Sequence, residues 1–178
     1  MIRNFFKHLH LINKHKWIVF KLTTKVGIPI RGLLHDLSKY SPTEFWESVK
    51  YFQGNTSPTN EAIKQKGYSK AVEHHVKRNK HHPEYWYNSK SEIKYPIIPY
   101  KYVAEMICDN LAANMVYNGK AWNQTTQKEY WEKNKDRKLL NPKIKALLTE
   151  VFSQVAENGI DKTLNKKNIK NLYTKFTE

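Results

Sequence analysis

Gly32-Leu-Leu-His35-Asp36-Leu-Ser-Lys39 is the stretch on which the fold depends, because it places an imidazole and a carboxylate side by side in largely apolar sequence. An ionised carboxylate in apolar surroundings costs free energy unless hydrogen-bond donors or a cation compensate it. Histidine and aspartate are also common metal ligands. The pair therefore predicts a metal site that other parts of the chain enclose.

Further candidate ligands lie on predicted helices before and after this stretch. His15 shares a face with Leu11 and Ile18, because spacings of three and four residues return to the same side of a helix. Asp109 lies in an apolar helical stripe, where its ionised carboxylate also needs a partner. His8, seven residues before His15, is the alternative first ligand if the helix has a different register.

Two pairs of adjacent histidines follow, His74-His75 and His81-His82. On a helix continued through this segment, positions 75 and 82 fall on one side, so His75 and His82 are the predicted ligands. His81 competes with His82 because the proline after the second pair disturbs the helix. His74 points to another side and is expected to support the site or contact a phosphate.

Helix signals recur along the chain, whereas strand signals do not. Ser41-Pro42-Thr43-Glu44 is a capping box with proline in the first helical position, and it predicts a helix to about Phe52. We prefer this capping role of Glu44 to a role in catalysis. The sequence is therefore predicted to be all-α. Further helices are predicted between Pro99 and Gly119, from Thr126 onward, and from Asn141-Pro142 to Gly159.

Composition narrows the class of protein. The 178 residues carry a formal net charge of +15, which favours anionic partners. No apolar run approaches the roughly 20 residues that span a bilayer, and no signal peptide is recognisable, so we expect a cytoplasmic protein without a membrane partner. The single cysteine, Cys108, excludes a disulfide framework and a cysteine-based zinc site.

Charge also divides the chain. Residues from about 124 onward are strongly basic and less aromatic than those before them. Residues 1–123 are therefore predicted to form the metal-binding helical domain. Residues 124–178 are predicted to form a basic helical extension that packs on the same domain.

The candidate ligands resemble a known set. His15, His35-Asp36 and Asp109 match the minimal ligands of the HD-domain metal-dependent phosphohydrolases. His35-Asp36-Leu-Ser-Lys39 is similar to that superfamily's frequent His-Asp-x-Gly-Lys, with serine in place of glycine. The later histidines resemble the extra ligands of members that bind two metals.

A narrower resemblance covers about residues 8–120. The motifs GLLHDLSKYSPTEFW, residues 32–46, and RNKHHPEYW, residues 78–86, resemble those of an uncharacterised family of bacterial and phage proteins. Some relatives carry a catalase label, which we discount because these motifs resemble an imidazole and carboxylate metal site rather than a haem pocket.

The HD-domain resemblance implies a helical bundle of HD-domain type and a hydrolase that cleaves a nucleotide or nucleic-acid phosphate with metal-activated water. Mixed imidazole and carboxylate ligation suits one or two divalent ions of Mn, Fe, Co, Ni or Zn better than Mg alone. The implied metal ligands are His15, His35, Asp36, His75, His82 and Asp109. The implied catalytic residues are Asp36 and Lys39, and the implied substrate-binding residues are Lys39, His74, Arg78 and His81.

Two other functions fit the same sequence. The first is a basic helical nucleic-acid-binding protein in which the metal site is structural, although no recognised nucleic-acid motif occurs. The second is an iron-dependent oxygenase of the wider HD superfamily, because the same ligands can hold iron. Salt-sensitive binding that persists after chelation would indicate the first, and oxygen consumption would indicate the second. The sequence makes no prediction of the oligomeric state.

Overall fold

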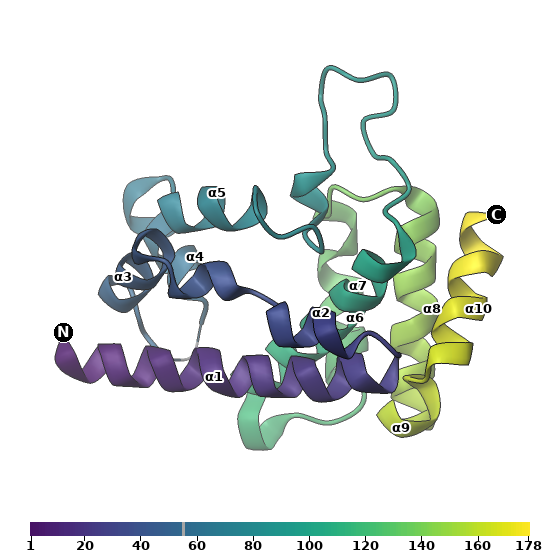
Figure 1. Cartoon of the computed structure of the whole chain (residues 1–178), viewed down its shortest axis with the longest axis horizontal. Coiled ribbons are helices and arrows are strands. Elements are labelled where there is room, and N and C mark those ends of the chain that lie inside the picture. Colours follow the sequence, from purple (N-terminus) through teal and green to yellow (C-terminus); the bar gives the residue numbers. More distant parts are fainter. Residues whose placement is uncertain (55) are drawn as a thin grey trace.

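The computed structural model describes residues 1–54 and 56–178, and this part of the chain is helical without a β-strand (Figure 1). The prediction of an all-α protein is confirmed. Glycine and proline also predict a loop from Gly54 to Pro58, and its residue Asn55 lies outside the described residues. The helices are α1 (Ile2–Lys25), α2 (Pro29–Leu34), α3 (Pro42–Lys50), α4 (Pro58–Lys66), α5 (Lys70–Val76), α6 (Tyr100–Asn118), α7 (Thr126–Asn134), α8 (Pro142–Asn158), α9 (Ile160–Thr163) and α10 (Lys166–Thr177), with 3₁₀ turns η1 (Leu37–Tyr40), η2 (Pro83–Tyr85), η3 (Gly119–Ala121) and η4 (Lys135–Arg137).

Cap residues set most of the predicted helix boundaries. The Ser41 hydroxyl accepts a hydrogen bond from the backbone N–H of Glu44 at the start of α3. Asn141 caps α8, which ends before Gly159. α6 fills the segment predicted between its proline and glycine boundaries. α7 differs by one position: Thr126 is its first residue rather than its cap, and its hydroxyl accepts from the backbone N–H of Asn123.

Two groups of helices lie towards opposite ends of α1. In Figure 1, α3, α4 and α5 lie over the N-terminal half of α1, whereas α8, α9 and α10 gather towards its C-terminal end. A small apolar cluster of Ile12, Phe45 and Val49 holds α3 against α1. Among the helices of the described residues, none has both the length and the apolar character needed to cross a membrane.

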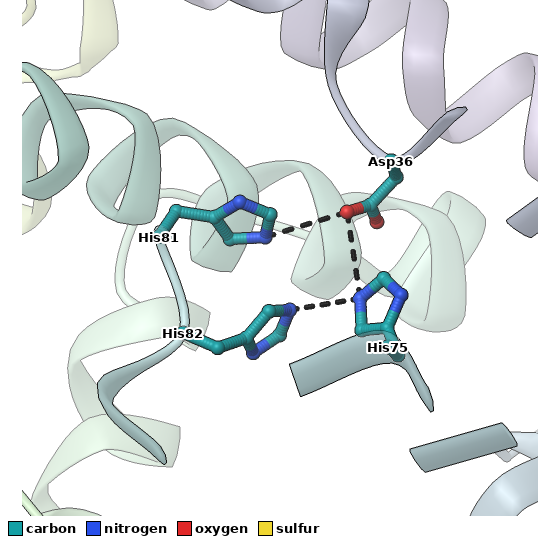
Figure 2. A group of neighbouring side chains, drawn as sticks. All are labelled: Asp36, His75, His81 and His82. Carbon is teal, nitrogen blue, oxygen red and sulfur yellow. Dashed lines mark hydrogen bonds and ion pairs between the residues drawn. The ribbon is translucent and has the colours of Figure 1, made fainter. Parts of the chain in front are cut away.

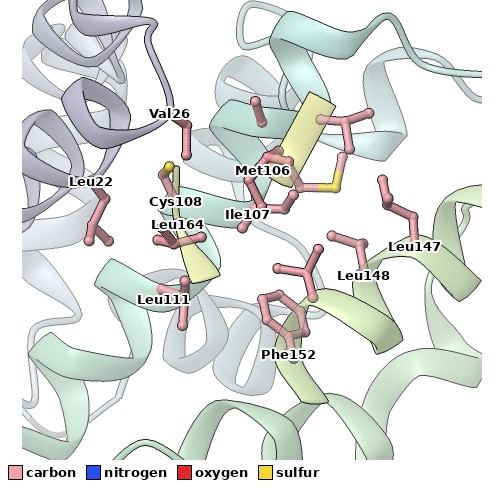
Figure 3. Packing of buried hydrophobic residues seen from close by; sticks show 14 of the residues in the cluster. Leu22, Val26, Met106, Ile107, Cys108, Leu111, Leu147, Leu148, Phe152 and Leu164 are labelled. Atoms are coloured by element: carbon pink, nitrogen blue, oxygen red, sulfur yellow. The ribbon is translucent and has the colours of Figure 1, made fainter. Parts of the chain in front are cut away.

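The main hydrophobic core is built from α1, α6, α8 and α10 (Figure 3). It includes Leu22 of α1, Leu111 of α6, Phe152 of α8 and Leu172 of α10. Burying one such side chain fully contributes about 1.5–3 kcal/mol. Residues 124–178 therefore share one core with α6, the helix that carries Asp109.

α2 packs very closely against α1 at Gly32. A Cβ atom built on Gly32 would lie 1.9 Å from Thr23 Oγ1 and 3.0 Å from the Cα of Phe20. Real side chains do not approach so closely, and the second of these atoms belongs to the backbone. The missing side chain of Gly32 thus lets α2 pack against α1 just before the His35-Asp36 turn.

We expect Gly32→Ala to lower the free energy of unfolding by about 1–3 kcal/mol, the usual cost of overpacking. Urea unfolding measures this loss. Leu33→Ala is the matched control, since Leu33 is the next residue of α2 and is 62% exposed. Equal stability of the two variants would contradict the close packing of the two helices.

Candidate metal centre

The turn between α2 and η1 aims two consecutive side chains at the same region. His35 follows α2 as its C-cap residue. Asp36 has φ 52° and ψ 32°, and it is the one non-glycine residue with positive φ in the described ranges. Aspartate tolerates this left-handed conformation better than most residues. Lys16 Nζ donates to the carbonyls of Leu33 at 3.0 Å and His35 at 2.8 Å, which ties the turn to α1. As a result His35 Nε2 and Asp36 Oδ2 lie 3.2 Å apart.

A first group of donor atoms comes from α1, this turn and α6. His15 Nε2 is 3.0 Å from Asp109 Oδ1 and 3.3 Å from His35 Nε2. His35 Nε2 is 3.4 Å from Asp109 Oδ1. Ligands that each bond an ion at about 2.0–2.2 Å are separated by roughly 3.0–3.5 Å in tetrahedral or octahedral geometry. The structure thus brings together His15, His35, Asp36 and Asp109 at spacings that fit a metal ion.

A second group lies on the other side of the Asp36 carboxylate (Figure 2). Asp36 Oδ1 is 3.4 Å from both His75 Nε2 and His81 Nε2, and His75 Nε2 is 2.9 Å from His82 Nε2. Oδ2 of the same carboxylate faces His35. Asp36 therefore lies between the two groups and presents one oxygen to each.

His81 and His82 competed as ligands in the sequence, but in the structure both belong to the second donor group. α5 ends at Val76, so the helical spacing that favoured His82 does not extend that far. His82 has an extended backbone, and both imidazoles of the pair face Asp36 and His75. His81 is 2% exposed and joins the donor group, so the structure places it with the predicted ligands rather than apart from them.

The residues present fit a cation. Within the described part of the chain, Asp36 Oδ1, Asp36 Oδ2 and His81 Nε2 are buried without a hydrogen bond of normal geometry. Lys39 Nζ lies 2.6 Å from Asp36 Oδ2 and supplies charge from one side. Buried polar atoms are rarely left in this state, because each loses its hydration without replacement. A metal ion bound to these atoms would satisfy the unpaired donor atoms of both Asp36 and His81.

Glu105 orients two of the histidines from behind. Its Oε1 accepts from His35 Nδ1 at 3.1 Å and lies 3.4 Å from His81 Nδ1. Its Oε2 accepts from the Arg31 guanidinium at 2.6 Å and 2.5 Å. A carboxylate on Nδ1 fixes the tautomer that leaves Nε2 free to bind a metal. Glu105 thus directs both Nε2 atoms towards Asp36.

Glu44 has the same relation to the second group. Its Oε2 accepts from His75 Nδ1 at 2.8 Å, and its Oε1 accepts from His74 Nδ1 at 2.6 Å. The backbone N–H of Ser41, which a capping-box glutamate would contact, instead donates to the carbonyl of Ser38. The preferred explanation of Glu44 by capping alone is therefore wrong. His74 is likewise engaged by this carboxylate rather than open to a phosphate.

A cavity of about 380 Å³ opens beside the donor groups. His15, His75, His82, Asp109 and Lys39 are among the residues that line it. His74 and Arg78 are not among its lining residues. Arg78 is exposed, and it donates to the carbonyl of His74 at 3.4 Å. The role of Arg78 in phosphate binding stays a prediction, without support from the lining of the cavity.

Charges within the cluster are strongly coupled. Burial opposes the charge of Asp36, but His35, Lys39 and His75 outweigh it and hold the pKa of Asp36 well below its usual value. Burial also opposes the charge of His35, yet Asp36, Asp109 and Glu105 raise the pKa of His35 well above its usual value. A metal ligand has to be deprotonated, so metal binding would release a proton from His35.

The pKa values of His82 and His15 are lowered, whereas the pKa of His35 is raised. Burial, aided by the neighbouring His81 and His75, lowers the pKa of His82 well below its usual value. Burial also lowers the pKa of His15, although Asp109 partly compensates. Neutral imidazole is the form that binds a metal, so these two side chains are in the right protonation state at neutral pH.

Sequence reasoning did not assign Glu105 to the site. Its signal was present: Glu105 is a charged residue in apolar sequence, four positions before Asp109 and therefore on the same helix face. His8, the alternative first ligand, is buried against Phe45 and Phe52 and lies outside the donor groups.

A family model matches residues 4–154 and is described as a family of unknown function (DUF5662). The chain belongs to this family. The matched region of the family contains every donor residue of both groups and continues past residue 123 into α8. No curated protein and no solved structure matches the chain.

Proposed function

We propose that the protein is a metal-dependent phosphohydrolase of HD-domain type that acts on the phosphate ester of a nucleotide or nucleic acid. The observation that carries this proposal is the position of Asp36 between two groups of imidazole and carboxylate donors, beside a cavity that Lys39 also lines. The order of the first donors along the chain, His15, His35-Asp36 and Asp109, supports the HD-domain assignment.

The donor groups would hold one or two divalent ions. His15, His35, Asp36 and Asp109 form the first site, and Asp36, His75, His81 and His82 form the second. This mixture of nitrogen and oxygen donors suits Mn, Fe, Co, Ni or Zn. A bound ion of this kind lowers the pKa of water to near neutrality and polarises a phosphoryl oxygen.

The protein's own residues position and stabilise the phosphate. Burial would lower the pKa of Lys39, but Asp36 and Asp109 outweigh it and raise that pKa above its usual value, so Lys39 stays charged. Its ammonium group is placed to neutralise negative charge that develops on the phosphoryl oxygens. Glu105 and Glu44 hold the imidazoles in fixed orientations throughout. In the net reaction water adds to phosphorus, the ester P–O bond breaks, and the alcohol leaves with a proton.

Elemental analysis and turnover test this proposal together. Protein reloaded with Mn, Fe, Co, Ni or Zn should contain about one to two equivalents of metal and should hydrolyse a member of a panel of mononucleotides, cyclic nucleotides and oligonucleotides. Chelation should abolish turnover and lower the melting temperature, since metal at a hundred times its Kd stabilises the folded state by about 2.7 kcal/mol.

Two results would contradict the proposal. Less than about half an equivalent of metal after reloading would remove the basis of the mechanism. Full metal content without turnover of any phosphate ester would favour one of the two other functions, a nucleic-acid-binding protein with a structural metal site or an iron-dependent oxygenase. Salt-sensitive binding of nucleic acid that persists after chelation identifies the former, and oxygen uptake by the iron-loaded protein identifies the latter.

A further inference from the structure

The basic C-terminal segment contributes directly to the wall of the cavity. Tyr130 of α7 and Lys138, which follows η4, line the cavity together with His82 and Asp109. Lys138 also lines a smaller hollow of about 90 Å³ that shares His82 and Asp109 with the first. Lys138 therefore lies where the two spaces meet, next to donor residues of both groups.

Lys138 forms no ion pair with any of the described residues, although Glu84 and Asp109 line the same two spaces. Lys39, the other lysine of the cavity wall, is paired with Asp36 at 2.6 Å. No carboxylate of residues 1–54 and 56–178 lies within 4.0 Å of the Lys138 ammonium group. A half-buried lysine beside a cavity is an anion site more readily than a structural element when no carboxylate within ion-pair distance uses its charge.

The shape of the cavity restricts the anion. Residues of α1, α3, α4, α5, α6 and α7 all contribute to its lining, and its volume of about 380 Å³ lies near the lower end of the usual range for small-molecule sites. A nucleic-acid strand requires an open groove that follows its backbone. This partly open cavity, walled by six helices, favours instead a small molecule that inserts a terminal phosphate.

The charge of the wall favours a phosphomonoester in particular. A monoester phosphate carries about −1.5 to −2 at neutral pH, whereas a diester carries a single negative charge. Glu44, Glu84 and Asp109 also line the cavity, but Glu44 and Asp109 are engaged by histidines and Glu84 is exposed. Lys39 is paired with Asp36, so Lys138 is the lysine of the wall whose charge is left for the phosphate. Tyr117 and Tyr130 border the space with aromatic surface that an organic group can contact.

We propose that Lys138 binds the phosphate of a small phosphomonoester and so makes the protein a monoesterase rather than a nuclease. This inference rests on the proposed phosphohydrolase function for the reaction, and on the geometry of the cavity for the choice of substrate.

Binding of inorganic phosphate tests the role of Lys138 without requiring turnover. Isothermal titration of the metal-loaded protein should show phosphate binding at least about tenfold weaker in Lys138→Ala, because a charge-assisted hydrogen bond is lost. Lys133→Ala is the matched control, since Lys133 is exposed on α7 and absent from the cavity wall. It should bind phosphate within about twofold of the unchanged protein. Lys138→Arg should retain most of the affinity, and thermal unfolding confirms that all variants are folded.

Hydrolysis of p-nitrophenyl phosphate and bis(p-nitrophenyl) phosphate tests the substrate class. We expect a higher kcat/KM for the monoester, and Lys138→Ala should lower it at least about tenfold. Equal phosphate affinity of Lys138→Ala and Lys133→Ala, or faster hydrolysis of the diester or of an oligonucleotide, would overturn the inference and leave the hydrolase proposal intact. Phosphate binding that depends on Lys138 without hydrolysis of any ester would overturn the hydrolase proposal and leave the anion site intact.

Discussion

Asp36→Asn is expected to remove metal from both donor groups at once and to lower hydrolytic activity by more than a hundredfold. Loss of an outer partner of a metal ligand already costs about 10–100-fold in affinity or activity, and Asp36 contributes a donor atom to each group. Asparagine has nearly the same shape and also tolerates the left-handed backbone of Asp36, so the turn should keep its conformation. The change therefore isolates the charge of the carboxylate from its geometry.

Metal content by elemental analysis and turnover of the reloaded protein measure the effect. Asp161→Asn is the control, because it makes the same chemical change at an exposed residue that pairs only with Lys25. An Asp36→Asn variant that keeps metal at both groups would show that this carboxylate does not link them. Near-ultraviolet circular dichroism would establish that the variant retains its packing.

Glu105→Ala is expected to reduce the free energy of unfolding by about 3–5 kcal/mol, because removing one partner of a buried ion pair leaves the others uncompensated. Glu105 is 2% exposed, and it holds Arg31, His35 and His81 together. Glu73→Ala is the control: Glu73 pairs with Lys77 at the surface, and its loss should cost at most about 1 kcal/mol. A loss below about 1 kcal/mol for Glu105→Ala, measured by urea unfolding, would contradict this account.

Glu105→Gln separates orientation from stability. The amide keeps the shape of the side chain but removes its charge, so metal affinity should fall by about 10–100-fold in a metal titration. Acid unfolding gives a second readout. Burial would raise the pKa of Glu105, but His35 and His81 outweigh it and lower the pKa from 4.5 to about 2. The stabilisation by Glu105 is therefore present above pH 4.5 and is lost as the pH falls towards about 2, a loss that Glu105→Gln should not show.

The parts of the site that sequence predicted are those that regular helices position. His15 and Asp109 follow helical periodicity, and the helix of Asp109 is framed by the proline and the glycine that predicted it. The His35-Asp36 pair was recognisable from its motif, although the turn that carries it and the left-handed backbone of Asp36 were not. Local patterns suffice where one helix face decides the direction of a side chain.

The remaining parts depend on contacts between distant segments. His81 and His82 both reach the cluster because α5 ends early and the chain turns, which a helical projection cannot represent. Glu44 satisfies a local capping pattern, yet its side chain binds histidines thirty residues away or more. Lys138 reaches the cavity only because the basic segment packs on α6, a tertiary arrangement that composition does not encode.

The core that α6 shares with α8 and α10 determines when, during synthesis, the metal site can form. A nascent chain released as far as residue 123 already contains every donor of both groups, from His15 to Asp109. α1 covers only part of the apolar surface of α6, however, and the rest has no cover until the ribosome has added α8 and α10. Domains acquire their structure as complete units during synthesis. We therefore expect metal to be captured only once α8 and α10 have been synthesised, because these late helices stabilise ligands made much earlier.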